Sequence, residues 1–294
     1  MQRRDFIQTT GAGLAALLAR PAWALSVNSP YLKTLGLQLY TLRNQLAEDV
    51  AGTIKAVADA GYHQVELMRV VGDEPIFRAA RDHGLQVTSA MIDWKTLISP
   101  GEPDVPSFQE TLDVAVKQKL KYLVIPYVGK GHRETADQLK VLARRANRAG
   151  EACRKAGIQL CYHHHSFEFA KLPDGMRGWD ILVEQFDPAL VKFEIDVFWA
   201  AIGGLDPVAT IRGLKGRVAQ LHLKDLLKGT PTNHDESTVP KEAFQEVGDG
   251  IVDWPAVLAA GQFAGVVQCH VEQDQSPDAI ASIGQSIRHL KSLP

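Results

Sequence analysis

Short apolar runs typical of β-strands alternate with longer helical patterns along most of the chain, and this order most constrains the fold. Eight runs have the length and composition of strands: 35–40, 64–68, 85–92, 122–128, 158–165, 191–197, 218–224 and 266–272. Helical patterns lie between them, for example at 50–60, 108–120, 135–156, 179–186, 207–214 and 255–260. This alternation predicts a single-domain α/β fold, a (β/α)8 TIM barrel of parallel strands.

The strands of the second half have one apolar and one polar face. In 191–197, for example, Phe193 and Ile195 alternate with Glu194 and Asp196. A strand covered by helices on both faces is normally apolar throughout, so the polar face is expected to point into the barrel lumen. Because unpaired buried polar groups cost about 1–3 kcal/mol each, such a lumen predicts a hydrogen-bonded network or a bound ion. The alternative, an antiparallel sheet with its polar face in water, is disfavoured by the long helical connections.

Four acidic or imidazole side chains lie at or just beyond the ends of successive strands: Glu168, Asp196, His222 and Glu272. Active sites of barrels form at the carboxyl ends of the strands. A single Asp or His at a strand end is more often structural, but four together predict a site for one divalent metal ion. Three carboxylates and an imidazole suit Mn²⁺, Mg²⁺, Co²⁺ or Fe²⁺ better than a structural Zn²⁺ site; we expect Mn²⁺, with Mg²⁺, Co²⁺, Fe²⁺ or Zn²⁺ as alternatives.

A divalent ion polarises a carbonyl group and stabilises the enediolate formed when the neighbouring carbon loses a proton. Glu168 and Glu272 come from opposite ends of the ligand series. They are therefore predicted to act also as catalytic acid and base on the two faces of a sugar.

Further side chains near strand ends are expected to contact or orient the substrate: His163, His165, Lys224, Glu66, Trp199 and Arg43. For the two histidines, contact with substrate or support of the ligands is favoured over direct metal binding. The polar segment 225–250 contains several glycines and prolines and is either a lid over the substrate or a surface insertion.

The first 24 residues have the features of a twin-arginine signal peptide. Arg3 and Arg4 precede an apolar stretch at 11–19, and Ala22-Trp23-Ala24 forms a small-x-small cleavage site. We expect residues 25–294 to form the barrel in the periplasm or another extracytoplasmic space; the alternative is an ordinary amino-terminal extension. The apolar stretch is too short to span a bilayer, so no stable membrane insertion is expected.

The net charge and the cysteine content limit which ligands and partners the protein is expected to have. A formal net charge of −2 gives no basic surface for nucleic acid, so a small polar substrate is favoured, and a homo-oligomer remains compatible. The three cysteines lack C-x-x-C spacing and predict neither a disulfide framework nor a zinc cluster.

Several motifs resemble those of the sugar phosphate isomerase/epimerase family, which has a xylose isomerase-like barrel. They are YHHHSFEF at 162–169, EIDVFWA at 194–200, GRVAQLHLKD at 216–225, VGDGIVDW at 247–254 and VEQD at 271–274. The resemblance implies that Glu168, Asp196, His222 and Glu272 are metal ligands and that the two glutamates move protons. Met91 stands where members often have a histidine, and His164 where they commonly have asparagine.

The expected function is isomerisation or epimerisation of an unphosphorylated keto-sugar, because export and the lack of an arginine cluster argue against sugar phosphates. The same proton abstraction also supports a lyase or dehydratase acting on a keto-sugar or a 3-keto-glycoside. A sugar-binding protein without catalysis and a DNA-repair endonuclease are the remaining alternatives. The endonuclease would need several metals and a basic groove.

Overall fold

The computed structural model of the protein describes residues 30–293. The predicted signal peptide at 1–24 lies outside this range. Within it, no helix is both long and apolar enough to cross a membrane.

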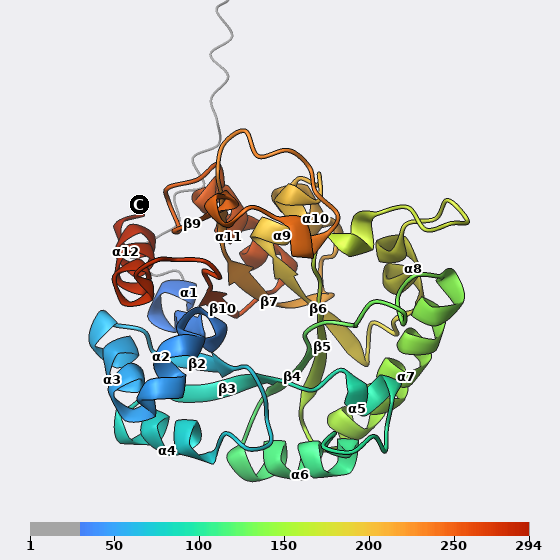
Figure 1. Ribbon diagram of the computed structural model, residues 1–294, viewed down its shortest axis with the longest axis horizontal. Helices are drawn as coiled ribbons and strands as arrows, with labels where there is room; N and C mark the ends of the chain where they lie inside the picture. Colours follow the sequence, from blue (N-terminus) through green and yellow to red (C-terminus); the bar gives the residue numbers. More distant parts are fainter. Residues whose placement is uncertain (1–29, 294) are drawn as a thin grey trace, which may run out of the picture.

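The described residues form a closed barrel of parallel strands, which confirms the predicted fold (Figure 1). The strands are β1 (Gly36–Gln38), β2 (Gln64–Leu67), β3 (Gln86–Met91), β4 (Tyr122–Ile125), β5 (Gln159–His163), β6 (Val191–Asp196), β7 (Val218–Leu223) and β10 (Gln268–Val271). They pair in the order β1-β10-β7-β6-β5-β4-β3-β2. The first strand closes the barrel against the last, with Leu37 opposite Val271.

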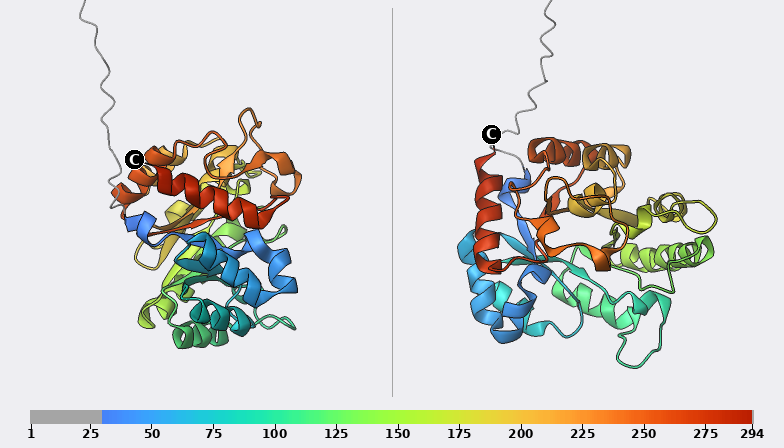
Figure 2. Two further views of the ribbon diagram at one scale, coloured as in Figure 1. Left: turned by 90° about the vertical axis from the view of Figure 1, so that its left-hand side faces the viewer. Right: turned by 45° about the horizontal axis from the view of Figure 1, so that its top comes forward.

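Helices surround the barrel and bury its apolar outer face (Figures 1 and 2). They are α1 (Pro30–Lys33), α2 (Arg43–Glu48), α3 (Val50–Ala60), α4 (Glu74–Asp82), α5 (Lys95–Ile98), α6 (Phe108–Gln118), α7 (Ala136–Lys155), α8 (Gly178–Gln185), α9 (Val197–Ile202), α10 (Pro207–Gly213), α11 (Trp254–Ala264) and α12 (Ala279–Ser292). Helix α12 packs against α3, so both ends of the described chain meet on one side (Figure 2). Gly61 ends α3 with φ of 93°, the left-handed conformation that glycine adopts at low cost.

The lumen is polar, as the alternation within the strands predicted. Near the amino ends of the strands, Thr88 donates to Gln64 and Gln268, and Gln268 donates to Gln220, with each heavy-atom distance between 2.7 and 2.9 Å. All four side chains are buried. This hydrogen-bonded layer closes the lumen beneath the site described below.

The segment 225–250 is held to the barrel at both ends. It contains a two-stranded sheet of β8 (Asp225–Leu226) and β9 (Phe244–Gln245), and the 3-10 turns η3 (Glu236–Thr238) and η4 (Lys241–Ala243). The buried carboxylate of Asp225 accepts hydrogen bonds from the backbone of Gly248 and Val252 and from the Trp254 indole. At the tip, Glu236 forms an ion pair with Arg133.

Candidate metal centre and active site

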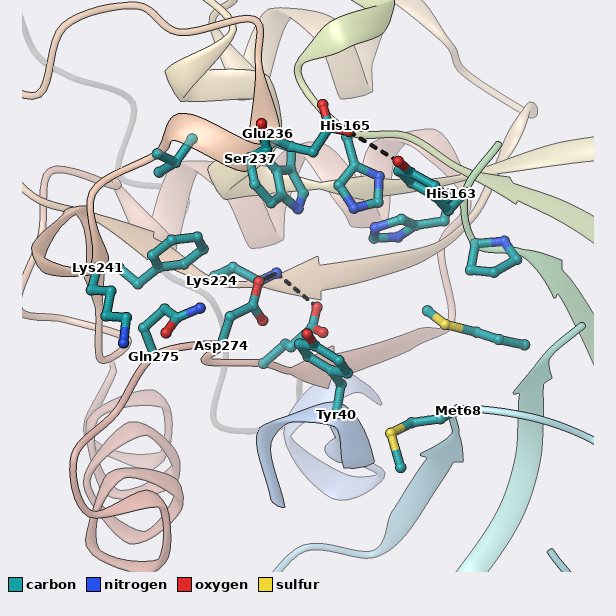
Figure 3. Close-up of a pocket in the computed structure, with 17 residues that line it drawn as sticks. Tyr40, Met68, His163, His165, Lys224, Glu236, Ser237, Lys241, Asp274 and Gln275 are labelled. Carbon is teal, nitrogen blue, oxygen red and sulfur yellow. Dashed lines mark hydrogen bonds and ion pairs between the residues drawn. The ribbon is translucent and has the colours of Figure 1, made fainter. Parts of the chain in front are cut away.

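A pocket of about 700 Å³ opens at the carboxyl ends of the strands (Figure 3). Five of the predicted site residues line it: His163, His165, Trp199, Lys224 and Glu272. Segment 225–250 supplies another wall through Glu236, Ser237, Val239, Lys241 and Phe244. This placement favours the lid reading of the segment over a surface insertion away from the site.

Three of the four predicted metal ligands lie together: Glu272 lines the pocket, and Asp196 and His222 are completely buried beside it. His222 Nδ1 lies 2.9 Å from Glu272 Oε2 and 3.8 Å from Asp196 Oδ2. His163 joins them, because ligand atoms of His163, Asp196 and His222 all lie within 4.8 Å of one another. These side chains come from β5, β6, β7 and the end of β10, four neighbouring strands of the barrel.

Asp196 is oriented by the helix that follows it. Its Oδ1 accepts a hydrogen bond of 2.9 Å from the backbone N–H of Trp199 and so caps α9. This cap explains why Val197, predicted as the last residue of a strand, instead begins a helix. Oδ2 is buried and has no hydrogen-bond partner among residues 30–293. A buried carboxylate oxygen that accepts no hydrogen bond and lies beside two imidazoles fits a divalent cation.

Lys224 places a positive charge among the acids of the pocket floor (Figure 3). Its Nζ lies 2.9 Å from Glu272 Oε2, 3.1 Å from Asp274 Oδ2 and 3.3 Å from Asp196 Oδ2. Burial raises the pKa of Glu272, but Lys224 and His222 outweigh it and hold that pKa well below its usual range. Burial raises the pKa of Asp274 to about 7 against the opposing effect of Lys224. The two acids therefore differ in protonation near neutral pH.

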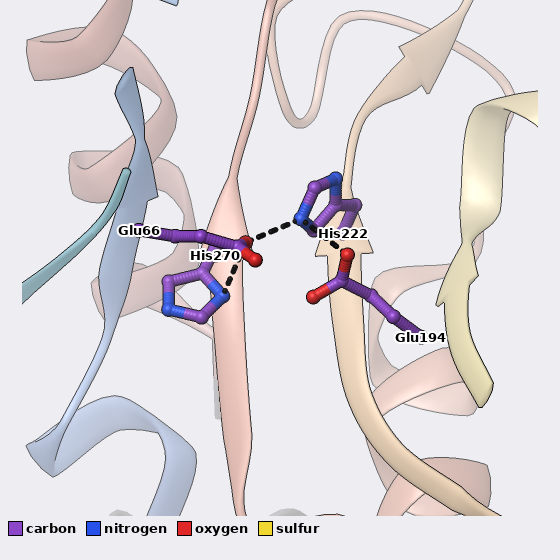
Figure 4. A group of neighbouring side chains, drawn as sticks. All are labelled: Glu66, Glu194, His222 and His270. Atoms are coloured by element: carbon purple, nitrogen blue, oxygen red, sulfur yellow. Dashed lines mark hydrogen bonds and ion pairs between the residues drawn. The ribbon is translucent and has the colours of Figure 1, made fainter. Parts of the chain in front are cut away.

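A second group of side chains lies in the lumen beneath His222 (Figure 4). His222 Nε2 is 2.7 Å from Glu66 Oε2 and 3.2 Å from Glu194 Oε2, and His270 Nδ1 is 3.3 Å from Glu66 Oε2. All four residues are completely buried. Glu66 was expected to contact substrate; the structure instead places it behind His222 and outside the pocket lining.

Glu168 does not join the other predicted ligands in the described structure. It lies in the 3-10 turn η2 (Phe167–Phe169), where Oε1 accepts from the Tyr162 hydroxyl and Oε2 from the His165 backbone N–H. It is in neither group of potential ligands and not in the pocket lining. Tyr162 packs against Phe186, which follows α8, so this hydrogen bond ties the carboxylate to a residue on the helix side of β5. Burial raises the pKa of Glu168 to about 8.

Arg43 is the remaining predicted substrate contact; it does not line the pocket, although its neighbour Tyr40 does. Arg43 stacks on Tyr40 and donates a 2.8 Å hydrogen bond to the backbone oxygen of Asp274. His164 lies outside the lumen against Phe169 and Trp179, as its strand position predicted.

Sequence reasoning missed Asp274, Glu194 and His270 as site residues. Each was visible in the pattern, because Glu194 and His270 lie two positions before Asp196 and Glu272 on the inward face, and Asp274 two positions after Glu272.

Residues 54–293 match the profile of the xylose isomerase-like TIM barrel family. The chain belongs to this family. Its curated relatives include inosose dehydratases: that of Clostridium tetani is 26% identical over 67% of this chain and 72% of its own length. The inosose dehydratase of Mesomycoplasma hyopneumoniae is 25% identical over 82% of this chain and 87% of its own length.

Solved structures share the fold. A sugar phosphate isomerase/epimerase from Parabacteroides distasonis superposes with a TM-score of 0.73 at 23% identity, covering 88% of this chain and 94% of its own. The IOLI protein with a bound zinc atom gives a TM-score of 0.61 at 14% identity, covering 88% and 96%. Members of the family therefore include isomerases, epimerases and dehydratases, and this chain has residues suited to a metal.

Proposed function

We propose that the protein is a divalent-metal-dependent lyase that removes a proton next to the carbonyl of an unphosphorylated keto-sugar or keto-glycoside and eliminates a group from the β carbon. The observation that carries this proposal is the convergence of Asp196 and His222 with Glu272, which lines the pocket. His163, Asp196, His222 and Glu272 would hold the ion. When bound, the ion supplies polarisation of the substrate carbonyl.

Two acids that line the pocket, Glu272 and Asp274, each carry out one of the two proton transfers. Glu272, kept ionised by Lys224 and His222, accepts the proton from carbon. Asp274, whose pKa is raised to about 7, donates a proton to the departing oxygen. Lys224 contacts both carboxylates and orients them. Solvent returns the proton from Glu272 to Asp274, so the cycle releases a neutral leaving group and restores the enzyme.

The charges of the pocket support an unphosphorylated substrate. Glu236, Glu272 and Asp274 line it, against the two cations Lys224 and Lys241. Lys224 is already engaged by three carboxylates. Of the two lysines that line the pocket, only Lys241 is then left to pair with a phosphate dianion.

Isomerisation or epimerisation of a keto-sugar is the second candidate. It is favoured by the same proton abstraction, but epimerisation also needs a second group on the opposite face of the sugar. Glu168, predicted for that role, is bound to Tyr162, whereas Glu272 and Asp274 both follow β10 and approach from one side. The inosose dehydratase relatives also favour elimination.

The test is incubation of the manganese-loaded protein with inososes, ketoses and 3-keto-glycosides in D₂O, followed by NMR. We expect loss of a β substituent together with exchange of the proton next to the carbonyl. Glu272→Gln should abolish exchange, whereas Asp274→Asn should retain exchange and lose elimination. A product with an inverted centre and no elimination would establish the second candidate, and no exchange on any of these substrates would refute both.

We also propose export by the twin-arginine route, on the strength of residues 1–24 alone. A Lys-Lys replacement of Arg3 and Arg4 should retain the protein inside the cell. Unchanged export of this variant would reject the proposal.

A further inference from the structure

One carboxylate oxygen lies beneath both histidines of the proposed metal centre. Glu194 Oε2 is 3.2 Å from His163 Nδ1 and 3.2 Å from His222 Nε2. The other oxygen, Oε1, accepts a 2.9 Å hydrogen bond from the Gln220 amide. Glu194 is completely buried, so no water competes for either oxygen.

Because Oε1 accepts from Gln220, Oε2 is the oxygen that faces the two rings, and as a carboxylate oxygen it accepts a hydrogen bond from each ring nitrogen beside it. His163 then has its proton on Nδ1 and His222 has one on Nε2. The opposite nitrogens, His163 Nε2 and His222 Nδ1, are left with lone pairs, and His222 Nδ1 lies beside Glu272 and Asp196. Without Glu194, the His163 ring would be free to adopt the other tautomer, which cannot bind a cation there, and His222 would keep only Glu66 as the acceptor for its Nε2 proton.

We propose that Glu194 is a positioning residue that sets the tautomer of His163 and, together with Glu66, that of His222, and thereby prepares two nitrogen ligands for one ion. The inference rests on the metal centre of the proposed function and adds a residue to it. Glu66 supports only His222, since its Oε2 lies 2.7 Å from Nε2 of that ring.

The competing reading is that Glu66, Glu194, His222 and His270 hold an ion of their own. The contacts argue against it, because hydrogen bonds engage Glu66, Glu194 and His222, although His270 Nδ1, 3.3 Å from Glu66, makes none. Gln268 Nε2 lies 3.3 Å from His270 Nε2, and Ser89 donates to Glu66 Oε1 at 3.0 Å. The Gln268 amide is a donor, so His270 has its proton on Nδ1, which faces Glu66.

The first test is ¹⁵N NMR of histidine-labelled protein loaded with Zn²⁺, with rings assigned through His163→Gln and His222→Gln. We expect the proton on Nδ1 of His163 and on Nε2 of His222. A proton on Nε2 of His163 would overturn the proposal, and this measurement needs no variant of Glu194.

The second test is zinc affinity by competition with a chelating dye. Glu194→Met removes both acceptors and should weaken binding about 10–100-fold, the usual effect of losing a group that orients a ligand. Glu194→Gln retains one carbonyl oxygen and should fall between this variant and the wild type. Asp73→Asn is the matched control, since Asp73 is a buried carboxylate paired with Arg69 outside the pocket; its affinity should be unchanged.

The outcomes separate the two proposals. A wild type that binds no zinc refutes the metal centre itself. Zinc affinity equal in Glu194→Met and the wild type refutes the role of Glu194 alone. Two zinc ions per chain, one of them lost in His270→Gln, would show that the lower group binds an ion and would also overturn the inference.

Discussion

The ammonium group of Lys224 lies 2.9 Å from Glu272 Oε2, and both side chains are buried in the pocket floor. Lys224 also contacts Asp196 and Asp274, so three carboxylates share one fixed positive charge. The stability of this floor therefore depends on cations.

Lys224→Met should destabilise the metal-free protein by about 3–5 kcal/mol, because it leaves buried carboxylates without their partner. A divalent ion should recover part of this loss by replacing the missing charge. Thermal unfolding of both proteins with and without Mn²⁺ measures the effect. If Mn²⁺ raised the Tm of the variant no more than that of the wild type, the charge argument would fail.

Asp196→Asn should separate the two roles of Asp196. The amide oxygen can still cap α9, whereas the amide nitrogen that replaces Oδ2 is no metal ligand. We expect zinc binding to weaken at least about tenfold with little change in the unfolding free energy. Asp196→Ala should cost a further 0.5–2 kcal/mol, roughly, through loss of the cap. Equal stability of the two variants, measured by urea unfolding, would show that the cap contributes nothing.

Glu168 should make stability depend on pH. Its pKa is raised from an ordinary value of 4.5 to about 8, so the fold favours the protonated form. This contribution is complete below pH 4.5 and is lost as the pH rises through 8, amounting to about 3–5 kcal/mol. Glu168→Gln should therefore lose less stability than the wild type between pH 5 and 8 in urea unfolding. If the unfolding free energies of the two proteins changed equally with pH, the raised pKa of Glu168 would be contradicted.

The same variant decides the metal role predicted for Glu168 from sequence. A side chain bound to Tyr162 and the His165 backbone should leave zinc affinity within about threefold of the wild type. A loss of a hundredfold would show that Glu168 turns into the pocket when an ion binds.

The ion pair between Arg133 and Glu236 should hold segment 225–250 over the pocket. Arg133 is 4% exposed in its side chain, packs on Phe167 and pairs with Glu236, which also accepts from the Tyr127 hydroxyl. Arg133→Met leaves the Glu236 charge buried, so limited proteolysis within 227–241 should accelerate about tenfold or more. Lys130→Met is the control, because its pair with Asp235 is exposed and worth little. Equal cleavage rates in both variants would show that the ion pair between Arg133 and Glu236 does not hold segment 225–250 in place.

The barrel could be predicted from the sequence because the alternation within strands and the spacing of helices are local features of the chain. The inward parity of Asp196, His222 and Glu272 follows from the same period of two. The direction of the Glu168 side chain could not be predicted in this way, because Glu168 lies beyond the end of its strand. There the backbone turn η2 and the hydrogen bond from the Tyr162 hydroxyl determine where the carboxylate lies. Glu194 and Glu66 were recognisable as inward residues, but their depth relative to His222 depends on the strand register across the barrel.

The pairing of β1 with β10 has a consequence for biosynthesis. The barrel cannot close until the strand ending at Val271 has left the ribosome, and Glu272 is the next residue along the chain. A nascent chain that stops earlier carries His163, Asp196 and His222 without the last carboxylate. Tight binding of a metal ion would therefore become possible only after the final strand has been synthesised. Metal loading would then follow translation and would not assist the folding of the nascent chain.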